Sequence, residues 1–367
     1  MKIVDMHCDT ISALLERRRN GGKCGLLENN CHVDLKRMKK GGYLLQNFAV
    51  FVDQGAVRDP WEEAMAQIEL YQEELNACQD LIAPVKCYED IAVNEALGKM
   101  SALLTVEEGA VCGGELEKLQ ILHDKGVRML TLTWNYQNEL GYPNLSHELG
   151  VEAWGKCHEL KNTGLAGDFS KEAQDEVDRI LKAYLNTPDT LHGLTQTGRE
   201  FVEEMERLHM IPDVSHLSDA GFYDVLKYTS KPFAASHSNA RAVCPCARNL
   251  TDDMIRALGE RGGVMGLNFC ADFLVQKPAG VHNPGTIADI VAHARHIADV
   301  GGIEVLGLGS DFDGIDTHEE LPGAEKMYHL ADALVKGGFL ASQVEKIFSQ
   351  NVLRLYRETL QTGTAEA

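Results

Sequence analysis

The sequence predicts a closed (β/α)8 barrel, in which eight parallel strands alternate with helices, with one insertion between the fourth and fifth strands. The chain has 367 residues, a length that a single α/β barrel commonly reaches. Short apolar runs repeatedly lead into turn residues and a helix-like stretch, which is the alternation of a parallel sheet. Residues 7–12 (HCDTIS) contain no glycine, whereas a doubly wound open sheet usually carries a glycine-rich phosphate turn after its first strand. We therefore expect one barrel domain over residues 1–367.

The expected strands are runs rich in Val, Ile, Leu and Phe, as is typical of strands covered on both faces. They span residues 2–7, 44–52, 101–107, 127–133, 210–215, 232–236, 263–268 and 304–310. The helices expected between them span residues 61–79, 115–125, 195–209, 217–228, 251–261, 285–300 and 342–360. Pro60 and Thr251 are suitable helix starts, and Gly126, Gly262 and Gly301 stand where helices are expected to end.

Residues 143–193 interrupt the alternation of strand and helix. They hold a helix-like run at 171–185 between turn-forming segments, and we interpret them as an insertion. The sequence leaves open whether this insertion lies over the barrel mouth or in a contact between the subunits of a homodimer.

Composition and charge exclude several classes of protein. Asp and Glu total 55 against 35 Lys and Arg, so the formal charge is −20 and most of the surface repels nucleic acid and anionic membranes. The first residues, Met-Lys-Ile-Val-Asp-Met-His, lack the apolar stretch of a signal peptide, and no later window resembles a membrane helix. We expect a cytoplasmic protein whose ten scattered cysteines are reduced thiols.

Metal-ligating side chains gather at the ends of the expected strands. His7, Asp9, Glu107, His216 and His237 all stand where a strand ends, and so does Asp311. Barrel active sites are built at the carboxyl ends of the strands, and imidazoles with carboxylates are ligands that catalytic zinc prefers. A bridging carboxylate would hold two metals with a shared hydroxide.

A single histidine at a strand end is more often structural than a ligand, and only the combination favours a metal site. The chain has 14 histidines, and the other eleven lie in expected helices or loops. We expect these to be surface or packing residues.

In several short motifs the chain resembles the membrane (renal) dipeptidase family of the amidohydrolase superfamily, particularly its bacterial cytosolic branch. The matching segments span nearly the whole chain, and their combination and order are more specific than any one of them. They are Asp5-Met-His-Cys-Asp9, Thr105-Val-Glu-Glu-Gly109, Leu130-Thr-Leu-Thr-Trp134, Asp213-Val-Ser-His216, Ser236-His-Ser-Asn239 with Arg248-Asn249, and Gly307-Leu-Gly-Ser-Asp-Phe-Asp-Gly314.

The resemblance implies a binuclear zinc centre. In that assignment His7 and Asp9 hold one zinc ion, His216 and His237 hold the other, and Glu107 bridges them. Glu108 is the competing bridge, because a shift of one residue would exchange the two glutamates.

The resemblance also implies two substrate contacts and reveals one departure. Asp311 matches the aspartate that contacts the metal-bound water and the substrate amino group. Arg248 matches the arginine that receives the substrate carboxylate, which a planar guanidinium can bind through both oxygens. Mammalian members carry a histidine after Thr-Leu-Thr, whereas this chain has Trp134 and then Asn135, so carbonyl polarisation would depend on zinc and on Asn135.

The expected activity is hydrolysis of the peptide bond of dipeptides, including those with a D-residue at the second position. Asp311 would act as the proton carrier and Glu107 as the catalytic bridge between two zinc ions. An N-acyl amino acid deacylase of the same superfamily is the alternative enzyme, but most such relatives open with His-x-His and often bridge through a carboxylated lysine. A non-catalytic barrel is the alternative outside the enzymes, although none of the metal ligands is missing.

Overall fold

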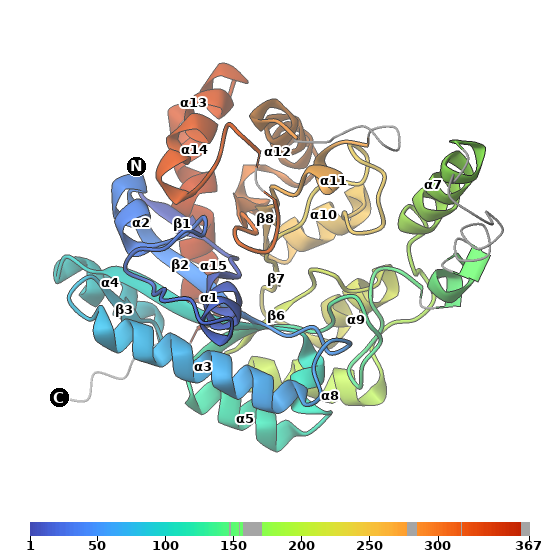
Figure 1. The fold of residues 1–367 in the computed structure, drawn as a ribbon. Helices are drawn as coiled ribbons and strands as arrows, with labels where there is room; N and C mark the ends of the chain where they lie inside the picture. The colour runs from blue at the N-terminus through green and yellow to red at the C-terminus, as the bar shows by residue number, and fades with distance from the viewer. Residues whose placement is uncertain (147, 154, 157–170, 277–284, 317, 361–367) are drawn as a thin grey trace.

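The strands form a closed parallel barrel, as the sequence predicts. The computed structural model describes residues 1–146, 148–153, 155–156, 171–276, 285–316 and 318–360. The strands run in the order β2-β1-β9-β8-β7-β6-β5-β4, and β2 pairs with β4 to close the ring (Figure 1). Their bounds are β1 Ile3–Asp5, β2 Tyr43–Phe51, β4 Met100–Glu107, β5 Val127–Thr131, β6 Ile211–Asp213, β7 Ala234–Ala235, β8 Val264–Leu267 and β9 Leu306–Leu308. Every predicted strand of the barrel is therefore confirmed.

One additional strand, β3 (Ile82–Pro84), was not predicted from the sequence. It pairs with the first residues of β4, on the side where β5 pairs with the last residues of β4. A run of three residues that ends in proline carries almost no periodicity, so only the pairing partner reveals it.

The helices surround the barrel (Figure 1). Predicted helices are confirmed as α3 Pro60–Ala77, α5 Leu116–Asp124, α8 Gln196–Arg207, α9 Asp219–Tyr228, α10 Asp252–Glu260 and α12 Ile287–Gly301. The predicted helix over 342–360 is divided into α14 (Ala341–Glu345), a π-helical turn (Lys346–Gln350) and α15 (Asn351–Thr359). Five helices were not predicted from the sequence: α1 Thr10–Arg19, α2 Leu35–Gly41, α4 Tyr88–Ala96, α11 Ala271–Leu274 and α13 Tyr328–Lys336.

Capping side chains explain why two of the predicted helices begin where they do. The Asp59 carboxylate accepts hydrogen bonds from the backbone N–H groups of Trp61 and Glu62, and Pro60 occupies the first turn of α3. The Thr251 hydroxyl accepts a hydrogen bond from the N–H of Met254 at the start of α10. Each cap pairs donors that the helix itself leaves without partners.

The barrel interior is filled by apolar side chains and is closed at its amino-terminal end by α15. Val352, Leu355 and Tyr356 of α15 pack with the inward-facing residues of the strands, which include Val4, Leu45, Leu103, Met129, Ile211, Ala234 and Val264. β9 contributes Gly307, where an added Cβ would approach the Val352 side chain to 2.9 Å. The core therefore occupies the lower barrel and leaves the carboxyl ends of the strands for polar side chains.

The predicted insertion lies between β5 and β6. Its helix α7 (Lys171–Leu185) has the predicted bounds and stands outside the ring of helices around the barrel (Figure 1). Residues 147, 154 and 157–170 of the insertion lie outside the described residues. Across the part of the chain that is described, no helix combines the length and apolar character needed to cross a membrane.

Candidate active site

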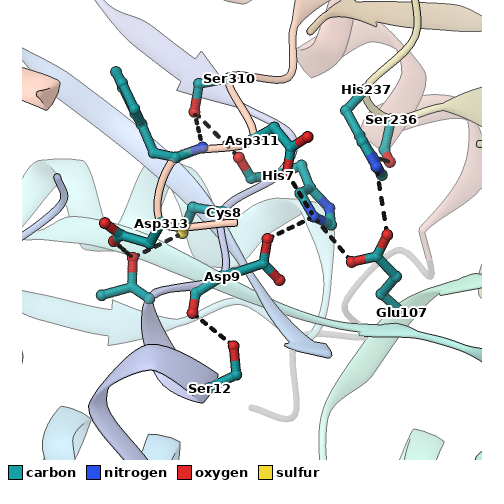
Figure 2. Close-up of polar contacts among 12 residues, drawn as sticks. His7, Cys8, Asp9, Ser12, Glu107, Ser236, His237, Ser310, Asp311 and Asp313 are labelled. Carbon is teal, nitrogen blue, oxygen red and sulfur yellow. Dashed lines mark hydrogen bonds and ion pairs between the residues drawn. The ribbon is translucent and has the colours of Figure 1, made fainter. Parts of the chain in front are cut away.

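The barrel brings six predicted side chains together at the carboxyl ends of five strands. His7 and Asp9 follow β1, Glu107 is the last residue of β4, and His216, His237 and Asp311 follow β6, β7 and β9. Most of them are shown in Figure 2, where the imidazoles and carboxylates point toward one another. All six are buried. Residues up to about 300 positions apart in the sequence therefore share one polar cluster.

Glu107 lies at the centre of this cluster and uses its two oxygens in different directions. Its Oε2 lies 3.2 Å from His7 Nε2. Its Oε1 lies 3.2 Å from His216 Nε2 and 3.4 Å from His237 Nε2. Two three-residue groups result, His7 with Asp9 and Glu107, and His216 with His237 and Glu107, and in each the candidate ligand atoms lie within 4.8 Å of one another.

Several buried nitrogen and oxygen atoms of the cluster lack a hydrogen-bond donor or acceptor in the part of the chain that the structure describes, and a bound cation would interact favourably with them. His7 Nε2 and Asp9 Oδ1 are buried and have no hydrogen-bond partner among the described residues. His216 Nε2 and His237 Nε2 face each other at 3.1 Å. Because buried polar atoms are normally paired, these residues fit the binding of divalent metal.

Hydrogen bonds to the far ring nitrogens orient two of the imidazoles. Ser236 donates its hydroxyl proton to Asp213, so its oxygen is left to accept from His237 Nδ1 at 2.7 Å. His216 Nδ1 donates to Asn135 Oδ1 at 3.2 Å. In both rings the proton is then on Nδ1, and Nε2 presents its lone pair to the cluster, as a metal ligand must.

Burial also favours the uncharged form of these two imidazoles. Burial and the nearby charge of Arg248 lower the pKa of His216 to about 4. Burial and the charge of His7 hold the pKa of His237 well below its usual range. Neutral imidazoles need no deprotonation before they bind a metal.

Glu108, the competing bridge, is held away from the cluster. Its carboxylate accepts hydrogen bonds from Ala110 N at 2.9 Å, Trp134 N at 3.2 Å and Asn138 Nδ2 at 2.5 Å. Its backbone φ is 107°, a value that residues other than glycine seldom adopt. Successive residues of a strand point to opposite faces, so Leu103 and Glu107 face the barrel interior while Glu108 does not.

Asp311 lies beside the cluster and is held by a residue that the sequence analysis missed. Its Oδ2 accepts a hydrogen bond from Asn268 Nδ2 at 2.9 Å, and its Oδ1 lies 3.9 Å from His7 Nε2. Burial raises the pKa of Asp311 to about 7. A carboxyl group with a pKa near neutrality is suited to accept a proton and release it again.

Arg248 is 6% exposed, and only two of its five N–H groups donate to described residues. Its Nη1 donates to Ser238 Oγ and its Nη2 to the His237 carbonyl, both at 2.7 Å, while its buried Nε has no partner among the described residues. The guanidinium is therefore fixed in place and still able to donate to an anion.

Trp134 and Asn135 border the cluster on the side of β5. The Trp134 ring packs edge-on against Phe51 at 4.9 Å and lies 6.3 Å from the His216 ring. Asn135 is exposed apart from its contact with His216. Trp134 therefore forms an apolar wall, and Asn135 is the polar group of this segment nearest to the candidate ligands.

Comparisons with known proteins agree with this geometry. The family model described as "Membrane dipeptidase (Peptidase family M19)" matches residues 1–183 and 144–367, which together cover the chain. The chain belongs to this family. It is therefore a metallo-dipeptidase, an enzyme that hydrolyses peptide bonds with the help of a metal.

Relatives of the dipeptidase cover most of its length. It is 30% identical over 289 residues to an uncharacterized protein in the pqqA 5′ region of Klebsiella pneumoniae, an alignment that covers 78% of this chain and 90% of that protein. It is 27% identical over 337 residues to dipeptidase tcpJ of Claviceps purpurea, across 89% of this chain and 69% of that protein.

Two solved structures are also similar. The M19 metallopeptidase called dipeptidase AC aligns with a TM-score of 0.81 and 25% identity over 98% of this chain and 99% of that one. A metallopeptidase from Rhodobacter sphaeroides aligns with a TM-score of 0.80 and 24% identity over 98% of this chain and 99% of that one. The second similarity supports the fold alone.

Two buried carboxylates below the cluster position the loops of the dipeptidase that carry the candidate ligands. Asp5 accepts hydrogen bonds from His7 N and from Ser310 N and Oγ, and so ties the end of β1 to the end of β9. Asp213 accepts from Thr131 Oγ1, Ser215 N and the N and Oγ of Ser236, and so ties β5, β6 and β7.

The supporting roles of Asn268 and Ser236 were not predicted from the sequence. Asn268 ends the predicted strand 263–268, and Ser236 ends the predicted strand 232–236. Their positions at strand ends were therefore a usable signal, but neutral side chains do not stand out as ionisable ones do.

Proposed function

We propose that this dipeptidase is a binuclear zinc enzyme in which His7, Asp9 and Glu107 hold one ion and Glu107, His216 and His237 hold the other. The position of Glu107 carries the proposal, because its two oxygens face two separate groups of imidazole and carboxylate ligands. Metal ions held by these residues would supply Lewis-acid chemistry, activating water near neutral pH and polarising the substrate carbonyl.

Asp311 and Arg248 have complementary roles in the proposed reaction. Asp311 takes the proton of the attacking water and delivers it to the departing amine, and Asn268 keeps its carboxylate in place. Arg248 donates guanidinium N–H groups to the substrate carboxylate while Nη1 and Nη2 keep their hydrogen bonds to Ser238 and to the His237 carbonyl. Fixing the carboxylate and the amino group at separate points favours substrates of two residues.

A D-residue at the second position is included in the proposed substrate range. The metallopeptidase from Rhodobacter sphaeroides was crystallised with a phosphinate mimic of L-Ala-D-Ala. We extend this substrate chemistry to the present chain as part of the proposal, and L-Ala-D-Ala is the direct test.

The decisive experiment measures hydrolysis of L-Ala-L-Ala, L-Ala-D-Ala and their N-acetylated and C-amidated forms by the zinc-loaded enzyme. We expect the free dipeptides to be cleaved far faster than the N-acetylated and C-amidated forms, about two zinc ions per chain by elemental analysis, and loss of activity in His216→Ala. Cleavage of the N-acetylated compounds in preference to the free dipeptides would instead identify an N-acyl amino acid deacylase.

A further inference from the structure

Two cavities of different character meet at the candidate metal centre. The smaller, of about 430 Å³, is bordered by Asp9, Glu107 and Asp311. The larger, of about 670 Å³, is bordered by Arg248 and by the insertion helix α7. His216 and Phe273 line both cavities, so the two join beside the candidate ligands.

The two cavities differ in the charged residues that line them. The described residues that line the smaller cavity include Glu16 and Asp53 in addition to Asp311, and none of them is a lysine or an arginine. The larger cavity is lined by residues of both signs, and Arg248 is its buried cation. A dipeptide bound with its ammonium group near Asp311 and its carboxylate at Arg248 would have its N-terminal residue beside the smaller cavity and its C-terminal residue beside the larger one.

The larger cavity has an apolar wall, on which Leu185 is exposed. Leu145, Leu181, Leu185, Phe273 and Val275 line it, and Leu185 is 50% exposed. Apolar surface of this kind gains free energy when a ligand removes it from water.

The end of α7 is attached to the segment that carries Arg248. The backbone N–H of Ala247 donates to the Leu185 carbonyl at 2.9 Å. Gln276 Nε2 donates to Asn186 Oδ1 at 2.5 Å and to the Pro245 carbonyl at 3.2 Å. The wall and the guanidinium are therefore parts of one hydrogen-bonded unit, which keeps Leu185 near the site for the substrate carboxylate.

We propose that the larger cavity receives the side chain of the C-terminal residue and that Leu185 of α7 makes the dipeptidase prefer substrates ending in a large apolar residue. The inference rests on the proposed orientation of the dipeptide between Asp311 and Arg248. A glycine at the second position leaves the wall exposed to water, whereas leucine or phenylalanine covers it. Because each methylene group that an apolar pocket accepts changes specificity by about tenfold or more, the preference is measurable.

The test is the ratio of kcat/KM for Ala-Leu to that for Ala-Gly, measured on the zinc-loaded, full-length enzyme. We expect a ratio of about ten or more for the wild type, a fall of about tenfold in that ratio for Leu185→Asp, and a smaller fall for Leu185→Ala. Leu191→Asp is the matched control, because Leu191 is 83% exposed and does not line either cavity, and its ratio should equal that of the wild type.

A second ratio, Leu-Gly over Ala-Gly, varies the N-terminal residue and should keep its wild-type value in Leu185→Asp. A wild-type ratio near one for Ala-Leu over Ala-Gly overturns the inference, as does a Leu185→Asp variant that changes both ratios equally or neither. These results leave the proposed function standing, because the dipeptides are still cleaved. Failure of the zinc-loaded wild type to cleave any of them refutes the proposed function and the inference with it.

Discussion

Replacing Arg248 with methionine should remove the ability of the enzyme to distinguish a free C-terminal carboxylate from an amide. Methionine has a similar length and is apolar, so it fills the buried site without offering a donor. Arg248 is 6% exposed, and only two of its five N–H groups donate to described residues. The structure therefore leaves charge-assisted donors for the substrate, at a place that water hardly reaches.

The size of the effect follows from this burial. Removing one partner of a buried, hydrogen-bonded charge pair costs about 2–5 kcal/mol. At about 1.4 kcal/mol for each factor of ten, kcat/KM for Ala-Ala should fall by roughly 30-fold to 4,000-fold. The rate for Ala-Ala amide, which carries no carboxylate, should change far less.

The assay compares kcat/KM for Ala-Ala and for Ala-Ala amide in the wild type and in Arg248→Met. Arg248 also donates to Ser238 Oγ, so Ser238→Ala is the control that removes this hydrogen bond and keeps the guanidinium. Thermal unfolding of both variants shows how much of the change is structural. If Arg248→Met still prefers the free acid as strongly as the wild type does, the assigned role of Arg248 is refuted.

Three further predictions concern the metal centre and its surroundings. Glu107→Gln should lower the zinc content from about two ions per chain to one or fewer and abolish dipeptide hydrolysis, because a neutral amide is a poor bridging ligand. Two retained ions by elemental analysis would contradict the proposal that both ions share Glu107. Burial raises the pKa of Glu108 to about 7, above its usual 4.5, so Glu108 binds its proton more tightly in the folded state. The stability that it contributes is present below about pH 4.5 and is lost as the pH rises through 7. In urea unfolding, the free energy of unfolding of the wild type relative to Glu108→Gln should therefore fall across that interval by up to about 3 kcal/mol. A constant difference would show that Glu108 titrates normally. Asn268→Ala removes a hydrogen bond that lowers the pKa of Asp311. The acid limb of the pH profile of kcat should therefore move to higher pH, and kcat near neutrality should fall by about tenfold. An acid limb that does not move would mean that Asn268 does not influence the protonation of Asp311.

Most of the barrel could be predicted because its strands have a strong local signal. Runs such as residues 44–52 and 101–107 consist mainly of apolar, β-branched or aromatic residues and are almost wholly buried, so they stand out from the helices between them. Helix α1 was missed although it follows the first site residues directly. Its sequence, TISALLERRR, buries few side chains and lacks a clear apolar face, so its helical form depends on packing against its neighbours α3 and β2.

The choice between Glu107 and Glu108 shows where local patterns are insufficient. Adjacent identical side chains have the same composition and the same chemistry, and an error of one residue in the strand would exchange them. The alternation of side chains along the strand distinguishes them. Glu107 is four residues after Leu103, so both point to the same face of the strand, which is the barrel interior. Glu108 then becomes the acceptor for Trp134 and Asn138, a role that no sequence pattern indicated.

The sequence by itself determined the fold class and the side chains that gather at one rim, because parallel strands place their carboxyl ends together and each strand end is readable locally. The tertiary structure alone decided how those side chains face one another. His216 and Asp311 turn toward the cluster through φ values of 68° and 63°, and Glu107 reaches imidazoles from three other strands. It also decided that α7 borders a cavity with Arg248. Such arrangements depend on contacts between distant segments, which residue type and spacing do not encode.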